Sequence, residues 1–275
     1  MISKALTIAG TDPTGGAGIQ ADLKTFQELG VFGMSVITSV VSQNTTGVFS
    51  FVDMDLDFVE SQIDVVFDDI RPDAVKTGML SNPEVIALVA KKHQEYDVNH
   101  FVLDPVMVAS SGHELISQDA RKAVREQLLP LATVVTPNLP EAEALTGLTI
   151  TTVEDMKRAG KMLVEEYGCR AALIKGGHYK GEADDYLYDG HAFKKYTAKR
   201  FDTVHTHGSG CTYAAAIAAG LAEGLDMEES ITRGKTFITS AISNPLELGQ
   251  GQGPTNHWGH RWEEMRKRDG RHWSK

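Results

Sequence analysis

Cysteine and long hydrophobic runs are scarce in this chain of 275 residues. Its two cysteines, Cys169 and Cys211, do not supply a disulfide framework, and we expect both to be reduced thiols in a cytoplasmic protein. No apolar stretch approaches the length of a transmembrane helix, so no membrane partner is expected. Near the N-terminus, Lys4 is followed by a short apolar strand, not by the long apolar run of a signal peptide.

Positive charge is also in short supply, because 37 acidic residues outnumber 27 basic ones and leave a formal net charge of -10. This balance disfavours broad attraction to nucleic acid. A local exception is the basic tail after Gly259, which we interpret as a solvated terminal helix. Repeats, low-complexity blocks and splitting linkers are absent from the sequence, so residues 1–275 are predicted to form a single domain.

Apolar β-like runs alternate with helical patterns through most of the chain, which is typical of a parallel sheet covered on both faces. Two later runs flank Asp189-Gly190, which predicts a hairpin and an antiparallel edge. The predicted strands are residues 5–9, 35–41, 74–77, 101–103, 132–136, 171–175, 186–188 and 191–193. The predicted helices are residues 18–29, 58–70, 83–95, 120–129, 141–145, 153–167, 211–223 and 227–243. The fold class is α/β with a mostly parallel central sheet.

Polar and glycine-rich loops fall mainly at the carboxyl ends of these strands, where ligands bind in open α/β sheets. The most informative loop contains Gly208, Ser209 and Gly210 and runs straight into an alanine-rich helix. Free backbone N–H groups at such a helix start attract an anion, typically a phosphate. Cys211 lies within this loop, where the helix N-terminus favours a reactive thiolate. A simple turn with a small buried cysteine explains the segment alone equally well.

The loop from Gly10 to Gly18 leads into a helix but fits neither G-x-G-x-x-G nor the P-loop pattern. Its glycines let a small substrate approach the backbone closely. Asp22, one turn into the helix, is interpreted either as a substrate contact or as a charge that favours the helix start. The carboxamide of Gln43 at a strand end suits the edge of an aminopyrimidine or pyridine, with ordinary loop polarity as the alternative.

Charged residues at other strand ends are candidates for a metal and phosphate site. Glu141 lies near a helix start with Asn138, and Mg²⁺ needs few protein ligands because it keeps most of its waters. The alternative is that this pair only caps the helix. Asp104 is a second candidate ligand of the metal. Lys175 before two glycines and Lys235 in a late helix could reach nucleotide phosphates, the alternative for Lys235 being a solvated helix charge.

Taken in order, these loops resemble the ribokinase-like superfamily, and most closely the hydroxymethylpyrimidine and hydroxymethylpyrimidine-phosphate kinases of thiamine synthesis. The resemblance covers nearly the whole chain and implies a three-layer α/β/α sandwich that dimerises. It also implies Mg²⁺-dependent transfer of the ATP γ-phosphoryl group to 4-amino-5-hydroxymethyl-2-methylpyrimidine and then to its monophosphate. The matching segments are residues 5–12, 15–22, 43–45, 76–79, 104–108, 136–142, 175–178, 206–212 and 251–257.

The resemblance further implies a role for each candidate residue. The transferring phosphoryl group would be bound by Gly208, Ser209 and Gly210, and Cys211 would occupy the position of the catalytic base. Residues implied to contact the pyrimidine are Gln43, Asp22, Gly10, Met79 and Val106. Residues implied to bind ATP are Lys175, Thr206, Asn138 and Lys235. Residues implied to hold Mg²⁺ are Glu141 and Asp104.

Two other functions fit parts of this sequence. One is a pyridoxal kinase of the same fold. Pyridoxal-selective members look to carry an additional cysteine after the Asp-Pro-Val-Met motif, whereas residues 109–112 here contain none. The other is a non-catalytic ligand-binding module, which predicts damaged motifs. The intact glycines around Ser209, together with Cys211, Asn138, Glu141 and Lys175, favour a working kinase.

Overall fold

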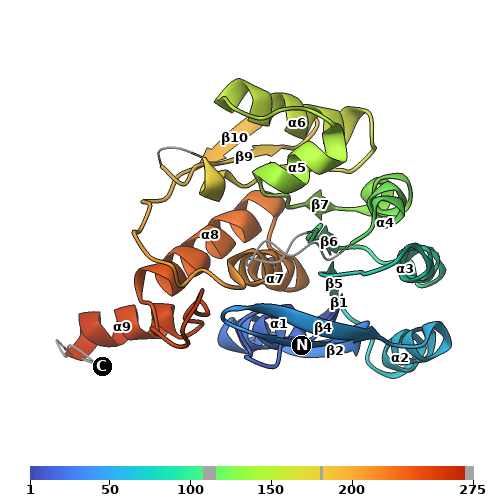
Figure 1. Ribbon diagram of the computed structural model, residues 1–275, viewed down its shortest axis with the longest axis horizontal. Coiled ribbons are helices and arrows are strands. Elements are labelled where there is room, and N and C mark those ends of the chain that lie inside the picture. The colour runs from blue at the N-terminus through green and yellow to red at the C-terminus, as the bar shows by residue number, and fades with distance from the viewer. Residues whose placement is uncertain (108–115, 180–181, 270–275) are drawn as a thin grey trace.

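Among the residues that the structure describes, eight strands form one sheet in the order β10-β9-β8-β7-β6-β5-β1-β2 (Figure 1). This computed structural model describes residues 1–107, 116–179 and 182–269. Six strands are parallel, namely β1 (Lys4–Ala9), β2 (Phe32–Ile37), β5 (Ala74–Thr77), β6 (Phe101–Leu103), β7 (Val134–Val135) and β8 (Ala172–Ile174). The antiparallel edge consists of β9 (Asp185–Tyr188) and β10 (Phe193–Tyr196). The predicted mostly parallel sheet with an antiparallel edge is confirmed.

Helices cover both faces of this sheet. The elements are α1 (Gly18–Glu28), α2 (Leu56–Asp69), α3 (Pro83–Glu95), α4 (Gln118–Ala123), α5 (Leu139–Thr146), α6 (Val153–Glu165), α7 (Ser209–Ala222), α8 (Met227–Ser243) and α9 (Gly259–Asp269). Figure 1 shows α2, α3 and α4 along one face and α7 with α8 on the other. Among the described residues, none of these helices combines the length and the apolar character needed to cross a bilayer.

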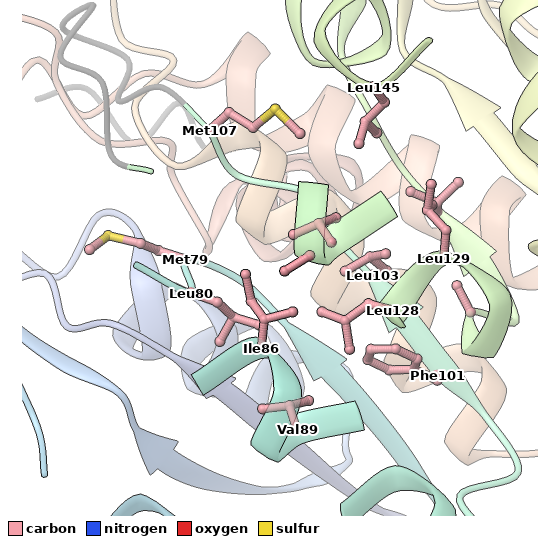
Figure 2. Packing of buried hydrophobic residues seen from close by; sticks show 14 of the residues in the cluster. Met79, Leu80, Ile86, Val89, Phe101, Leu103, Met107, Leu128, Leu129 and Leu145 are labelled. Atoms are coloured by element: carbon pink, nitrogen blue, oxygen red, sulfur yellow. The ribbon is translucent and has the colours of Figure 1, made fainter. Parts of the chain in front are cut away.

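Alternate residues of the parallel strands belong to two hydrophobic cores, one on each face of the sheet. Phe101 and Leu103 point into the larger core, while Val102 between them joins the core under α7. Figure 2 shows the larger core, where Phe101 and Leu103 of β6 pack near Ile86 and Leu128. Successive side chains of a strand point to opposite faces of the sheet. Because helices cover both faces here, all residues of a central strand are buried and the strand is a short, continuous apolar run.

The alanine-rich sequence of α7 lets this helix lie against the centre of the sheet. Every residue from Thr212 to Ala222 is buried. A helix that is apolar on all sides belongs in a protein interior, and alanine side chains allow a close approach. The start of α7 is thereby held at the carboxyl edge of β1, β5 and β6, the strands that the helix contacts.

The observed elements differ most clearly from the predicted ones in four places. The predicted strand 35–41 is two strands, because the chain bends at Thr38 and β3 (Ser39–Asn44) pairs with β4 (Gly47–Asp53) in a separate sheet. The strand β4 was not predicted. The predicted helix 120–129 gives way after α4 to a π turn and a 3₁₀ turn that contains Pro130. Residues 189–192 form a turn, because the Asp189 carboxylate accepts the backbone N–H groups of His191 and Ala192, so the last strand begins later than predicted.

Candidate active site

A cavity of about 610 Å³ opens at the carboxyl edge of the parallel strands. Fourteen of the fifteen predicted site residues line it, and Asp22 is the exception. The lining residues are Gly10, Gln43, Met79, Asp104, Val106, Asn138, Glu141, Lys175, Thr206, Gly208, Ser209, Gly210, Cys211 and Lys235. Loops that are far apart in the sequence therefore meet where parallel strands end, as the placement of ligands in open α/β sheets predicts.

The anion loop predicted before α7 has the backbone geometry that an anion site needs. Gly208 is left-handed with a φ of 75°, and a Cβ at this position would collide with the carbonyl oxygen of Gly16. The N–H of Thr212 already bonds the carbonyl of Gly208, and no side chain of the described residues caps the helix. The N–H of Ser209 donates to the carbonyl of Thr206 at 3.1 Å, so among the described residues the N–H groups of Gly210 and Cys211 are the ones open to an anion.

Cys211 lines the same cavity and is half-buried, but its thiol does not have the predicted electrostatics. Burial raises the pKa of Cys211 to about 11, with Lys76 opposing this rise and the carboxylates of Asp22 and Asp104 adding to it. The expectation that the helix N-terminus favours the thiolate is therefore wrong. Burial is the largest cause of the raised pKa, and the carboxylates of Asp22 and Asp104 add to it.

Asp22 does not line the cavity, and its carboxylate is bonded to Thr7 and Lys76. Its fully buried carboxylate accepts a hydrogen bond of 2.6 Å from Thr7 Oγ1 and lies 2.9 Å from Lys76 Nζ, which is also fully buried. Although burial opposes it, Asp22 raises the pKa of Lys76 and keeps this amine charged. Neither predicted role of Asp22 matches this position, because the residue lies past the first turn of α1 and is sealed from the ligand space.

Asp104, Glu141 and Lys175 form a charged cluster where β6, β7 and β8 end. Lys175 Nζ donates to Asp104 Oδ1 at 3.2 Å, while Asp104 Oδ2 is buried without a hydrogen-bond partner among the described residues. Burial raises the pKa of Glu141 to about 7, with Lys175 opposing and Asp104 adding to the rise. In the part of the chain described, no three acidic, histidine or cysteine residues are grouped as a complete metal cage.

Asn138 and Glu141 also cap α5, as the alternative interpretation predicts. Asn138 Oδ1 accepts the N–H of Glu141 at 2.9 Å, and Glu141 Oε2 accepts the N–H of Asn138 at 2.8 Å. One oxygen of Glu141 is therefore committed to the capping box. Both residues line the cavity as well, so capping and a place in the site occur together.

Lys235 is not the solvated helix charge of the alternative interpretation. Its ammonium group donates to Asp185 Oδ2 and to the carbonyl oxygen of Ala183, both at 2.6 Å. It also lies 5.9 Å from the ring centroid of Tyr213. This pairing neutralises part of its charge while one side of the residue faces the cavity.

The other end of the cavity combines an amide with apolar walls. Gln43, Gly10, Met79 and Val106 meet there, and a Cβ on Gly10 would lie 3.7 Å from Met79 Sδ. Among the described residues, no group hydrogen-bonds the Gln43 carboxamide, so its donor and acceptor are available to a ligand. A flat heterocycle with polar ring atoms suits such walls.

Sequence reasoning missed two groups at this site. The first is Lys76, a lysine within an otherwise apolar strand, which is a recognisable sign of a buried ion pair. The second is His207, whose Nε2 lies 2.7 Å from Asp12 Oδ2. Both residues stand inside the motifs that carry the family resemblance, but their partners become visible only in three dimensions.

The fold and this cavity define a phosphotransferase of the ribokinase-like class, with an anion loop at a helix start opposite an acceptor pocket. The model of the family described as "Phosphomethylpyrimidine kinase" matches residues 12–256, and the chain belongs to this family. A curated hydroxymethylpyrimidine/phosphomethylpyrimidine kinase of Bacillus subtilis is 48% identical over 94% of this chain and 95% of its own. Its counterpart from Haemophilus influenzae is 46% identical over 94% of this chain and 97% of its own.

Solved structures give the same result. The ADP complex of a Bacillus subtilis pyridoxal kinase has a TM-score of 0.89 and 43% identity, and the match covers 95% of this chain and 99% of that one. A phosphomethylpyrimidine kinase of Clostridium difficile has a TM-score of 0.79 and 44% identity, with 88% of this chain and all of that one covered. The predicted ribokinase-like fold and kinase class are confirmed.

Proposed function

We propose that this chain transfers the γ-phosphoryl group of ATP to the hydroxymethyl group of 4-amino-5-hydroxymethyl-2-methylpyrimidine, and then to the resulting monophosphate. The observation that carries the proposal is the open start of α7, which shares one cavity with the free carboxamide of Gln43. Phosphoryl transfer depends mostly on positioning and charge stabilisation, which this arrangement supplies. The names of the close relatives support the same substrate.

The two ends of the cavity suit the two substrates. In this proposal Gln43 pairs with the amino and ring nitrogen atoms of the pyrimidine, and Met79 and Val106, which line the same cavity, form walls against its ring. At the other end, Lys175 and Lys235 are placed to contact nucleotide phosphates, beside Thr206 and Asn138. We propose that the loop of Gly208, Ser209 and Gly210, which lines the same cavity, binds the phosphoryl group as it passes from donor to acceptor.

A direct assay tests this proposal by presenting the pyrimidine alcohol, its monophosphate and pyridoxal side by side with ATP. The pyrimidine substrates are expected to give the highest kcat/KM. Changing Gln43→Ala should raise the KM for the pyrimidine about fivefold, since one good hydrogen bond contributes about 1 kcal/mol, and should leave the KM for ATP unchanged. Equal effects on both KM values would contradict the proposed contact.

Cys211 is placed to accept the proton of the attacking hydroxyl group. Because its pKa is raised to about 11, the resting thiol must lose a proton first, and the buried Lys76 favours that loss. Single-turnover rates of the wild type should therefore rise with pH from 6.5 to 9. This rise should disappear in Cys211→Ser and Cys211→Ala, with a loss of about 10²-fold or more. Near-normal chemistry in both variants would make Cys211 a structural residue.

Mg²⁺ fits the acidic residues at the nucleotide end. Asp104 has a buried oxygen without a partner, and Glu141 keeps one oxygen outside its capping box. With so few protein ligands the ion would keep several waters, as Mg²⁺ commonly does. When bound, the ion neutralises charge on the phosphate oxygens. Asp104 and Glu141 would hold the ion, and Lys175 would add positive charge beside it.

Pyridoxal is a second candidate acceptor, because the pyridoxal kinase of Bacillus subtilis shares this fold at a TM-score of 0.89. Residues 109–112, which lack the additional cysteine, lie outside the described residues. Without that thiol we expect pyridoxal to be a poorer substrate than the pyrimidine. The side-by-side assay decides between them, since a higher kcat/KM for pyridoxal would reverse the assignment.

We also propose that the chain works as a homodimer in the cytoplasm, with both of its thiols reduced. Large apolar side chains are exposed on the small sheet and on the neighbouring α2, and they are Val40, Phe49, Phe51, Val52 and Phe58. A second copy would cover such a patch, because a twofold axis pairs a surface with itself. Light scattering should report a dimer, and Phe49→Ser with Val52→Ser should yield monomers. A monomeric wild type would refute the dimer.

A further inference from the structure

A buried carboxylate and a cavity-lining imidazole join the two glycine loops of the site. Asp12 is fully buried in the loop after β1. The distance from its Oδ2 atom to the Nε2 atom of His207, in the anion loop, is 2.7 Å. His207 is 12% exposed at its side chain and lines the cavity. The pair therefore connects the loop that carries Gly10 with the loop that carries Gly208.

At one end of this pair, the Asp12 carboxylate organises its own loop. It accepts the N–H groups of Thr14 at 2.9 Å, Gly16 at 3.1 Å and Ala17 at 2.8 Å, together with the hydroxyl of Thr14. Although burial opposes ionisation, the hydrogen bonds from His207 and Thr14 lower the pKa of Asp12 to about 2. The carboxylate is thus a permanent acceptor that holds the glycine loop in one shape.

At the other end, His207 is tied to the segment that completes the cavity wall. The backbone N–H of His207 donates to the carbonyl of Gly253 at 3.1 Å, and the backbone carbonyl of His207 accepts the N–H of Thr255 at 3.1 Å. The two glycine loops touch directly beside the imidazole, since a Cβ on Gly16 would lie 2.7 Å from His207 Cδ2. Little space is left for either loop to shift while the hydrogen bond holds.

We propose that His207 is a positioning residue for phosphoryl transfer. Through its bond to Asp12 it fixes the position of the loop from Gly10 to Gly18, which we call the acceptor loop, relative to the anion loop that contains Gly208. This inference rests on the proposed function, because it concerns the distance between the acceptor hydroxyl and the transferring phosphoryl group. A displacement of about 1 Å between reacting groups can cost on the order of 10²-fold in rate. A loosened register also lets water take the place of the acceptor.

The test compares His207→Ala with His207→Gln, which keeps an N–H donor at about the same reach, and with the exposed His191→Ala as control. We measure kcat, both KM values, and the ratio of ATP consumed to pyrimidine phosphorylated. His207→Ala should lose on the order of 10²-fold in kcat and consume excess ATP. His207→Gln should recover most of the rate and the coupling, and His191→Ala should match the wild type.

Thermal unfolding and a double variant separate positioning from folding. If Asp12→Asn and His207→Ala act through one bond, the double variant should be no slower than the slower single variant. If His207 only supported the fold, His207→Ala would lower the unfolding midpoint while the folded molecules kept wild-type kcat and coupling. That outcome, or a Gln variant as poor as the Ala variant, would overturn the inference. A wild type inactive on pyrimidines would instead refute the proposed function.

Discussion

Two helices of this protein begin with the same local device and differ in what surrounds it. The helix α5 starts with Asn138 and Glu141 in a reciprocal capping box, and α8 starts with Asp226 and Glu229 in the same arrangement. The backbone N–H of Glu141 is bonded at 2.9 Å and that of Glu229 at 2.8 Å. Judged by the cap alone, the two helix starts are equivalent.

The difference lies in their position relative to the sheet. α5 follows β7 at the carboxyl edge, where Glu141 is 5% exposed and faces the cavity near Asp104 and Lys175. The corresponding Glu229 of α8 is exposed to solvent and lines no part of that cavity. A capping motif becomes part of a binding site when the fold places it at a strand end beside other charges.

The largest expected effect comes from Asp104, whose carboxylate lies after β6 and near Glu141 of α5. Changing Asp104→Asn should reduce kcat/KM for ATP by about 100-fold or more, because Lys175 loses its partner and the proposed Mg²⁺ loses a ligand. Asp226→Asn, which keeps a capping oxygen, should leave activity unchanged. Steady-state kinetics on equal amounts of folded protein provide the measurement. Matching activities in the two variants would remove the functional difference between the helix starts.

Much of the site could be predicted from the sequence. The carboxyl ends of parallel strands lie at one edge of the sheet, so predicting the strands also predicts which loops meet there. Asp104, Asn138 and Lys175 follow from that rule and line the cavity. Gln43 also lines the cavity, but it lies in β3 of the small antiparallel sheet, where the rule does not apply. The failures have a different origin. The sealed position of Asp22 depends on its pairing with Lys76, contributed by another element.

The electrostatics of Cys211 show the same limit. Its helix-start position is visible in the sequence, but its pKa depends on burial and on carboxylates from other loops. The small sheet of β3 and β4 was missed because the β-branched run continues across the bend at Thr38, where only tertiary hydrogen bonds mark the change. Local pattern predicts elements and strand ends, whereas charge balance requires the packed neighbours.

A second prediction concerns pH. The pKa of Glu141 is raised from 4.5 to about 7, so its contribution to stability is present below pH 4.5 and is lost as pH rises through 7. Between pH 5 and 8 the wild type should therefore lose unfolding free energy relative to Glu141→Gln, by on the order of 2 kcal/mol. Denaturant unfolding of both proteins at the two pH values measures this. A constant difference would show that Glu141 has an ordinary pKa, and a change of opposite sign would show that its pKa is lowered; either result would contradict the prediction.

The smallest expected effect is shared by both helix starts. Asn138→Ala and Asp226→Ala each remove a capping oxygen and should each cost about 1 kcal/mol of unfolding free energy. Only Asn138→Ala should also slow phosphoryl transfer, since it alone lines the cavity. Chemical denaturation and a kinase assay on the same samples test both statements. Slowed transfer in Asp226→Ala would mean that stability, and not position, sets the rate.

The central claim is that the cap of α5 is also part of the metal and phosphate site. The direct measurement is the initial rate against Mg²⁺ concentration at fixed ATP, for the wild type, Glu141→Gln and Glu229→Gln. We expect the Glu141 variant to need at least about tenfold more Mg²⁺ for its half-maximal rate, and the Glu229 variant to follow the wild-type curve. Three superimposable curves, or equal shifts in the two variants, would contradict the claim.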